Sequence, residues 1–344
     1  MTANRNPAAT TSGEVVTLNG PWPGVGPFLF TAYHLDEYPA GNADLGPAEG
    51  VAGRPIGQDF NNPSGWNMYH AETVPGFPAH PHRGFETITV VRQGTVDHAD
   101  STGAGARYGA GDVQWVTAGA GVVHSEMFPL LNQDADNPFE IYQVWINLPA
   151  ASKMADPQFT MMWREQVPVI EADGAKVSVV AGEFGGRTAV APPVASWAAQ
   201  AEADVRILLI ELDAHASVTV PGTRAGTERM LYVHGAGGVE AGGVAVAVAS
   251  GQGFKPGDDG AVTVTAGDAP SVVLLLQGKP IGEPVAQAGP FVMNTRAELV
   301  QAYEDYQRTQ FGGWPWPSTA PVHPAETERF AVFGDGTEQH PGGR

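Results

Sequence analysis

The chain has 344 residues and a formal net charge of −19 at neutral pH, because 37 Asp and Glu residues outnumber 18 Lys and Arg residues. This acidic balance argues against direct nucleic-acid binding, which needs a basic surface. The sequence has no cysteine, which excludes disulfides, thiolate nucleophiles and Cys-ligated zinc or iron–sulfur sites. Any metal must therefore bind to histidine and carboxylate side chains.

Hydrophobic residues make up 42% of the chain and charged residues 16%, which is typical of a well-packed globular protein. The 44 Gly and 29 Pro favour short strands joined by tight turns, so we expect an all-β protein, and the length suggests two domains. Residues 1–20 lack the apolar stretch of a signal peptide, and no apolar run approaches the ~20 residues of a membrane helix. We expect a cytoplasmic protein that does not interact with membranes.

The first half of the chain shows the pattern of a β domain. Residues 1–14 have no core-facing pattern and predict a disordered arm. Residues 15–150 then contain β-branched or aromatic runs bounded by glycine, which read as strands: Thr87–Val91, Val113–Thr117 and Phe139–Trp145. The stretch from Pro149 to Pro168 has little β pattern and a proline at each end, which predicts an interdomain linker over residues 151–168.

A second β series over residues 169–290 has the spacing of a jelly roll. Its expected strands are Lys176–Ala181, Val205–Leu212, Ser217–Val220, Met230–Val233, Val244–Ala249, Ala261–Thr265 and Ser271–Leu276. The similar strand spacing of the two halves suggests a duplicated fold, although the halves do not align residue by residue.

Residues 291–344 predict a helix followed by an extended tail. Leu299, Ala302, Tyr303 and Tyr306 recur at helical spacing, and Thr295 with Glu298 forms a capping box ahead of them. Beyond Gly312 the chain is rich in Pro, Gly and Trp. We expect a surface tail there, anchored by Trp314 and Trp316 if it is anchored at all.

Two short motifs concentrate the side chains that could bind a metal. His80 and His82 stand at i and i+2, so both point to the same side of an extended strand. His124 and Glu126 repeat this spacing about forty residues later, roughly the distance needed to return as a neighbouring strand. Together the motifs predict a metal site of three histidines and one carboxylate.

The ligand types limit the choice of metal without deciding it. Imidazole and carboxylate at a site with open positions suit Fe(II), Mn(II), Co(II) or Ni(II), and we expect Fe(II) first, with Cu or Zn as further alternatives. A single histidine in a strand is more often a hydrogen-bonded polar residue than a ligand. We keep that simpler interpretation for the seven histidines outside the motifs: His34, His70, His98, His215, His234, His323 and His340.

At these motifs the chain resembles the pirin family of the cupin superfamily. The matching segments are HPHRGFET, DHADS, GDVQWVTAGAGVVHSEM, QVWINLP, KMADPQF (Lys153–Phe159) and GEPVAQAGPFVMNT (Gly282–Thr295). The resemblance runs from about Gly26 to Gly313 and holds only in pattern over about 185–270. It implies two cupin barrels in tandem, with the metal in the N-terminal barrel on His80, His82, His124 and Glu126. The second barrel would lack a metal site.

The resemblance also implies what the site does. Pirin-like proteins are associated with quercetin 2,3-dioxygenase activity, in which a flavonol reacts with O₂ and its ring is opened with loss of CO. Glu126 would then be both ligand and general base. Glu86 stands where many cupins place a carboxylate ligand, and we expect it to support the site or form a salt bridge instead. Phe85, Trp115 and Gln143 are our candidates for the wall of the substrate pocket.

A second function stays open. Eukaryotic pirins are described as transcriptional cofactors, so this chain could be a metal-binding regulator or redox sensor that acts through a protein partner without turnover. The acidic composition fits a protein partner and does not fit direct contact with DNA.

Overall fold

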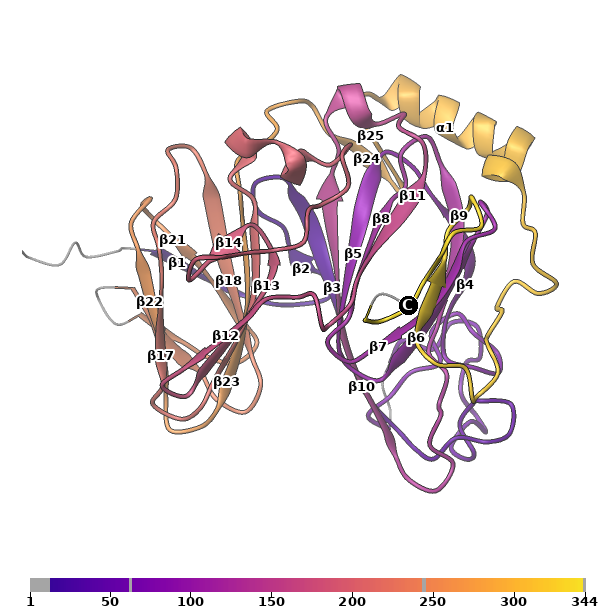
Figure 1. The fold of residues 1–344 in the computed structure, drawn as a ribbon, viewed down its shortest axis with the longest axis horizontal. Helices are drawn as coiled ribbons and strands as arrows, with labels where there is room; N and C mark the ends of the chain where they lie inside the picture. Colours follow the sequence, from indigo (N-terminus) through magenta and orange to yellow (C-terminus); the bar gives the residue numbers. More distant parts are fainter. Residues whose placement is uncertain (1–12, 62–63, 243–245, 343–344) are drawn as a thin grey trace, which may run out of the picture. The chain divides into compact units, whose positions relative to one another are not determined.

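The computed structural model describes residues 13–61, 64–242 and 246–342 and divides the chain into two compact units (Figure 1). Of the described residues, those within 31–166, 193–196 and 282–342 form the N-terminal barrel. Those within 13–30, 167–192 and 197–281 form the C-terminal barrel. Strands dominate both units, as the predicted all-β fold with two cupin barrels requires.

Two sheets form the N-terminal barrel. One has the order β11-β8-β5-β10-β3, with strands Gln158–Met162, Val113–Thr117, Phe85–Gln93, Asn137–Asn147 and Phe28–Tyr38. The other has the order β27-β26-β7-β6-β9-β4, with strands Glu338–Gln339, Phe330–Val332, Gly105–Gly109, Thr95–Asp100, Val122–Met127 and Gly76–His82. Buried side chains from both sheets share one core, for example Val91 and Val116 with Val96 and Tyr108.

The C-terminal barrel also contains two sheets. One has the order β1-β21-β18-β23-β16-β13-β12, with strands Gly13–Thr17, Gln252–Pro256, Glu228–His234, Ser271–Gly278, Arg206–Leu212, Ala175–Ala181 and Val169–Ala172. The other has the order β17-β22-β19-β20, with strands Ser217–Val220, Val262–Ala266, Val239–Ala241 and Val246–Val248. Leu208, Leu231, Val264 and Leu275 are fully buried between them, and most of this core is aliphatic.

Short elements complete the two units. The short strands of the C-terminal barrel are β2 (Trp22–Pro23), β14 (Glu183–Phe184) and β15 (Arg187–Thr188). The short 3₁₀ helices are η1 (Ala150–Ser152), η2 (Trp197–Ala199), η3 (Ala201–Ala203) and η4 (Gln310–Gly312).

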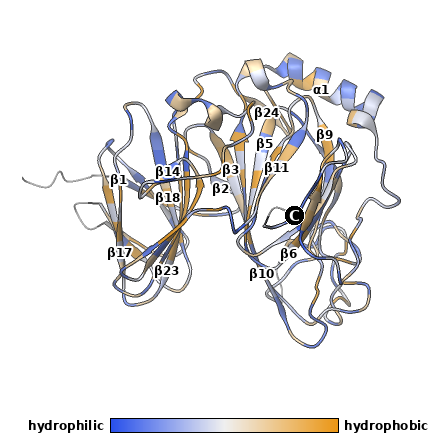
Figure 2. Cartoon of the chain, viewed as in Figure 1, coloured by the Kyte–Doolittle hydropathy of each residue, from blue (hydrophilic) through white to orange (hydrophobic). Residues whose placement is uncertain are grey.

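The predicted C-terminal helix is confirmed as α1 (Arg296–Thr309). The Thr295 side chain accepts a hydrogen bond from the Glu298 amide, and the Glu298 carboxylate accepts one from the Thr295 amide, which completes the capping box. Leu299 and Ala302 are the buried residues of the helix, and Figure 2 shows that most of α1 is hydrophilic. The helix therefore packs through a narrow apolar stripe and leaves the rest of its surface to solvent.

Residues 282–344 belong to the N-terminal barrel. The hairpin β24 (Ala286–Ala288) and β25 (Phe291–Met293) packs against α1 in a small apolar cluster of its own. The tail beyond it adds β26 to the edge strand β7, and Trp316 Nε1 donates to the Asp100 carbonyl at 2.8 Å. Buried Arg107 donates to four carbonyl groups of residues 323–327, so the tail is packed against the barrel beyond its two tryptophans.

The predicted domain boundaries differ from these units in several places. Residues 15–30, expected in the N-terminal domain, belong to the C-terminal barrel, and residues 282–290, expected in the C-terminal domain, belong to the N-terminal barrel. The predicted linker contains β11, which pairs with β8 in the N-terminal barrel; its alternation was hidden because Phe159, Met161 and Met162 are all buried. The predicted disordered arm, residues 1–14, lies outside the described residues up to residue 12, and Gly13 already begins β1. Of the strand expected over 244–249, the structure describes the part from Val246 onward.

Candidate metal centre

Antiparallel pairing of β4 and β9 brings the three predicted histidines together. His80 lies opposite His124 and His82 lies opposite Val122, so His80 and His82 face the same side as His124. A register shift between Phe77 and His80 places one extra residue in β4, because three steps along β4 match two steps along β9. The candidate ligand atoms of the three rings all lie within 4.8 Å of one another, which forms a group that could hold a metal ion.

The hydrogen bonds of the rings leave nitrogen atoms free for a metal. His80 Nδ1 lies 2.9 Å from the Pro78 carbonyl and His82 Nδ1 lies 3.4 Å from the Pro290 carbonyl. Because a carbonyl oxygen only accepts, each Nδ1 must carry the proton, and each Nε2 then presents its lone pair. Within the described residues, His82 Nε2 and both ring nitrogens of His124 are buried without a hydrogen-bond partner.

The buried nitrogens without a partner indicate whether the site fits a cation. A buried polar atom without a partner is costly, and a metal ion at the lone pairs would remove that cost. Burial also lowers the pKa of all three histidines, most strongly for His82 and His124, so the rings are neutral, which is the form that binds metal. The residues present therefore fit a divalent transition metal.

Glu126 lies beside the histidine group. Its Oε2 is 3.7 Å from His124 Nε2 and accepts a hydrogen bond of 2.7 Å from Gln143 Nε2. Its Oε1 accepts a longer hydrogen bond, 3.3 Å, from the Thr89 hydroxyl. The Gln143 amide is fixed in turn by Trp145, whose indole N–H donates to Gln143 Oε1 at 3.2 Å. These contacts hold one carboxylate oxygen on the histidine side of the barrel interior.

The three pocket candidates have different positions. Gln143 contacts Glu126 directly, as described above. The Phe85 ring lies 5.0 Å from the His82 ring and stacks on Trp145 at 4.0 Å, but it is fully buried. Trp115 is opposite Ile88 in the β5–β8 register, next to the pair Thr89 and Gln114. Because neighbouring residues in a strand point to opposite faces, Trp115 faces away from the side that carries Thr89 and Glu126. The structure thus does not bring Trp115 to the histidine group.

Glu86 is separate from the histidine group in the structure. It accepts a hydrogen bond of 2.7 Å from the Thr117 hydroxyl and is fully buried. Burial raises its pKa to about 7, although hydrogen bonds to its charged form oppose the rise.

Sequence reasoning missed the residues that anchor the His82 turn. Arg83 Nη1 donates to Asp305 on α1 at 2.9 Å, and Arg83 Nε donates to the Ala120 carbonyl. Lys153, which is 2% exposed, donates to the carbonyls of Gly84 and Val292 and to the Asn147 side chain. The sequence signal for this anchor was Lys153 in the motif KMADPQF. In the structure Lys153 is buried, and a buried lysine needs a full set of hydrogen-bond acceptors. The turn after His82 is therefore held by the segment that follows the second barrel.

The other histidines keep their simpler interpretation where the structure shows a partner. His98 Nε2 lies 3.3 Å from Asp100 Oδ2, and its ring is 5.5 Å from the His124 ring. His215 is largely exposed, and the His234 ring lies 5.8 Å from Trp22. Within the described residues, the possible metal group is the one in the N-terminal barrel.

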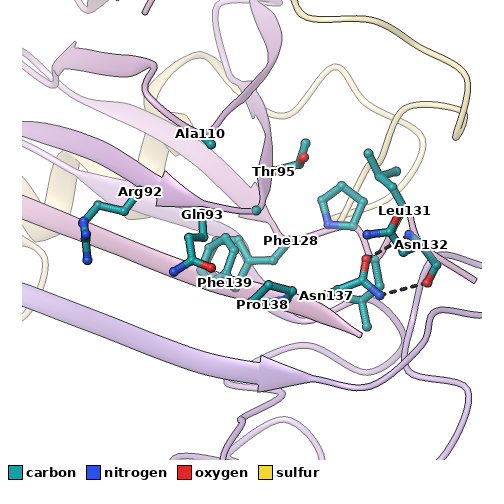
Figure 3. Close-up of a pocket in the computed structure, with 13 residues that line it drawn as sticks. Arg92, Gln93, Thr95, Ala110, Phe128, Leu131, Asn132, Asn137, Pro138 and Phe139 are labelled. Atoms are coloured by element: carbon teal, nitrogen blue, oxygen red, sulfur yellow. Dashed lines mark hydrogen bonds between the residues drawn. The ribbon is translucent and has the colours of Figure 1, made fainter. Parts of the chain in front are cut away.

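A separate pocket of about 390 Å³ opens at the ends of β5 and β10 (Figure 3). Phe128, Leu131 and Phe139 give it apolar walls, while the Asn137 amide donates within the pocket rim to the Asn132 carbonyl. None of the three histidines lines this pocket.

Two family models match the chain. The Pirin model matches residues 56–146, and the model of the Pirin C-terminal cupin domain matches residues 207–312. The first range contains both motifs that predict the metal site. The described residues contain no helix that is long and apolar enough to span a membrane.

Individual relatives extend the likeness over most of the chain. Pirin-1 of Arabidopsis thaliana is 37% identical over 69% of this chain and 78% of its own length. A pirin-like protein of Caulobacter vibrioides is 41% identical over 71% of this chain and 84% of its own length. Among solved structures, a quercetin 2,3-dioxygenase from Acinetobacter baumannii matches with a TM-score of 0.70 at 26% identity, over 89% of this chain and 99% of that chain.

Proposed function

Because this chain belongs to the pirin family, we propose that it is a metal-dependent dioxygenase that opens the ring of a flavonol such as quercetin by 2,3-dioxygenation. The observation that carries the proposal is the group of three histidines beside a carboxylate, in which His82 and His124 have buried ring nitrogens without a hydrogen-bond partner. The fold likeness to a solved quercetin 2,3-dioxygenase supports the choice of reaction.

His80, His82, His124 and Glu126 would hold one divalent transition metal, and we expect Fe(II) ahead of Mn, Co, Ni, Cu or Zn. When bound, such a metal supplies Lewis acidity at the substrate oxygens and reactivity toward O₂. In the reaction both atoms of O₂ enter the products, and one ring carbon leaves as CO. The substrate class is therefore a small aromatic molecule with a hydroxyl group next to a carbonyl.

In this proposal Glu126 accepts the proton of the flavonol hydroxyl. Its Oε2 already lies on the histidine side of the barrel, 3.7 Å from His124 Nε2. The Gln143 amide donates to the same oxygen, which fixes the direction of the carboxylate. Phe85 and Trp145, stacked against each other beside His82, would keep water from the inner wall of the site.

The metal assignment is tested by elemental analysis of the purified chain. We expect about one transition metal per chain, and His82→Ala or His124→Ala should lose it, because each removes one of the few ligands. The matched control is the double variant His215→Ala and His234→Ala in the other barrel, which should keep its metal. Equal metal content in the parent and in His82→Ala would contradict the proposed metal site. Loss of metal in the control would show that the C-terminal barrel holds the metal.

The catalytic role is tested by turnover of quercetin with O₂, followed by loss of its absorbance and by release of CO. Glu126→Gln keeps an oxygen atom at the same position but removes the proton acceptor. Metal should be retained in part, while turnover falls by roughly the 10² to 10⁴ typical of a lost general base. Full turnover by the metal-loaded variant would show that Glu126 is only a ligand.

The burial of the group favours a second candidate function. His82, His124 and Glu126 are each less than 5% exposed, so a large substrate must displace side chains to reach them. A metal-binding regulator or redox sensor that acts through a protein partner needs no such access. Metal binding without O₂ consumption on quercetin would favour this function over the enzyme.

A further inference from the structure

A cluster of aromatic side chains adjoins the candidate metal centre. Phe77 is on β4, three residues before His80, and their ring centroids are 6.3 Å apart. The cluster continues away from His80 through rings from β3 and from the connection between β3 and β4. We define the aromatic cluster as His34, Phe60, Tyr69, His70 and Phe77.

The rings of the cluster contact one another closely. Tyr69 stacks on Phe77 with centroids 4.9 Å apart and an interplanar angle of 29°. His34 meets both of these rings edge-on, at 4.8 Å from Tyr69 and 5.6 Å from Phe77. The Phe60 ring lies 5.6 Å from Tyr69 and 6.4 Å from Phe77. The rings of the cluster therefore lie side by side, in stacked and in edge-on contact.

The residues of the cluster differ in exposure. Phe60 is 48% exposed and Tyr69 is 3% exposed, while Phe77 and His80 are partly buried. Tyr69 belongs to the core of the barrel and Phe77 packs against that core. Through Phe77 the exposed Phe60 is connected to His80, which is the most accessible of the three histidines.

Hydrogen bonds determine what His34 can offer a ligand. Tyr69 Oη donates to Asp36 Oδ2 at 2.6 Å, so its single proton is already used. His34 Nδ1 lies 2.8 Å from the same Tyr69 Oη and must therefore be the donor of that pair. The remaining nitrogen, His34 Nε2, then carries a lone pair. Burial lowers the pKa of His34 to about 4, so the ring is neutral at pH 7.

We infer that the aromatic cluster is the recognition site for a planar, hydroxylated aromatic substrate, with a substrate ring stacked on Phe77 and a hydroxyl donating to His34 Nε2. Aromatic rings provide stacking surface for a planar ligand, and a neutral imidazole acceptor selects for a hydroxyl donor. Glu126 is opposite Phe77 in the β4–β9 register, so a ligand on Phe77 lies near the proposed base. This inference rests on the proposed function, because it names the residues that would deliver the same substrate class to the metal.

The test uses quercetin binding to the metal-loaded chain without O₂, so that recognition is measured apart from turnover. Phe77→Leu keeps an apolar side chain but removes the ring, and we expect the Kd for quercetin to rise roughly 2- to 12-fold, the range for one aromatic pair. The matched control is Phe333→Leu, because Phe333 is likewise a partly buried ring packed against the core of the same barrel. The control should bind quercetin like the parent.

His34→Phe tests the hydroxyl acceptor through selectivity. The parent should bind quercetin more tightly than flavone, which has the same ring system without hydroxyl groups. The variant should lose roughly 10-fold of that preference, the effect of one hydrogen bond, while its metal content stays at the parental level. A merely structural role for His34 would weaken both ligands equally and leave their ratio unchanged.

The outcomes separate this inference from the proposed function. If the parent binds quercetin and the variants weaken binding as expected, but no turnover follows with O₂, the cluster is confirmed and the dioxygenase function fails. If the parent does not bind quercetin, or if Phe77→Leu and His34→Phe bind both ligands like the parent, the inference about the cluster is overturned. Metal analysis of each variant shows that a change in binding does not arise from a lost metal.

Discussion

The Glu86 carboxyl provides a direct test of how burial controls stability in this protein. Burial raises the pKa of Glu86 from the ordinary 4.5 to about 7 in the folded chain. Between these two pH values the folded protein keeps a proton on Glu86 that the unfolded chain has released. The contribution of Glu86 to the free energy of unfolding is therefore complete below pH 4.5 and is lost as pH rises through about 7.

The size of the effect follows from the pKa values. A rise from 4.5 to about 7 corresponds to roughly 3 kcal/mol between the two ends of this range. Glu86→Gln keeps the shape of the protonated acid and can still accept the hydrogen bond from Thr117. The variant stays neutral at every pH. We expect its advantage in stability over the parent to grow with pH, by up to roughly 3 kcal/mol between pH 4.5 and pH 8.

Urea unfolding at several pH values between 4.5 and 8 measures this difference. The matched control is Glu171→Gln, an exposed glutamate on β12, whose stability should follow that of the parent across the whole range. Our reasoning is refuted if the stability of Glu86→Gln changes with pH as steeply as that of the parent. It is also refuted if Glu171→Gln removes the same amount of pH dependence.

Three further predictions concern the segment after the second barrel and the residues that contact it. Asp305→Asn should speed metal release to a chelator, because it weakens the ion pair that anchors the turn after His82, whereas loss of Arg308 should not. Thr295→Ala should lower the midpoint of urea unfolding by an amount equivalent to about 1 kcal/mol, the usual value of an N-cap. Gly121→Ala should destabilise by about 1 to 3 kcal/mol in the same assay, since φ is +133° and a Cβ would lie 2.6 Å from the Phe311 ring. An unchanged rate of metal release would contradict the first prediction, and unchanged unfolding midpoints would contradict the other two.

The sequence determined the parts of this protein that depend on local patterns. Strand residues such as Val113–Thr117 and the capping box at Thr295 have neighbours in the chain that decide their conformation, and both were predicted. The spacing of His80 with His82 also fixed their common direction, because side chains alternate along a strand. Grouping those two rings with His124 required only that one strand return beside another.

The tertiary structure decided everything that depends on which distant segments meet. Pro290 provides the carbonyl that orients His82, and Asp305 binds Arg83, although both follow these residues by more than 200 positions. The face of Trp115 was set by its register with Ile88, which the periodicity of a single strand does not reveal. His34 looked like any lone histidine, and only its pairing with Tyr69 and Asp36 left one nitrogen as an acceptor. The local pattern fixes which side chains of a strand share a face. The partners on that face are fixed by packing between segments that are distant in the sequence.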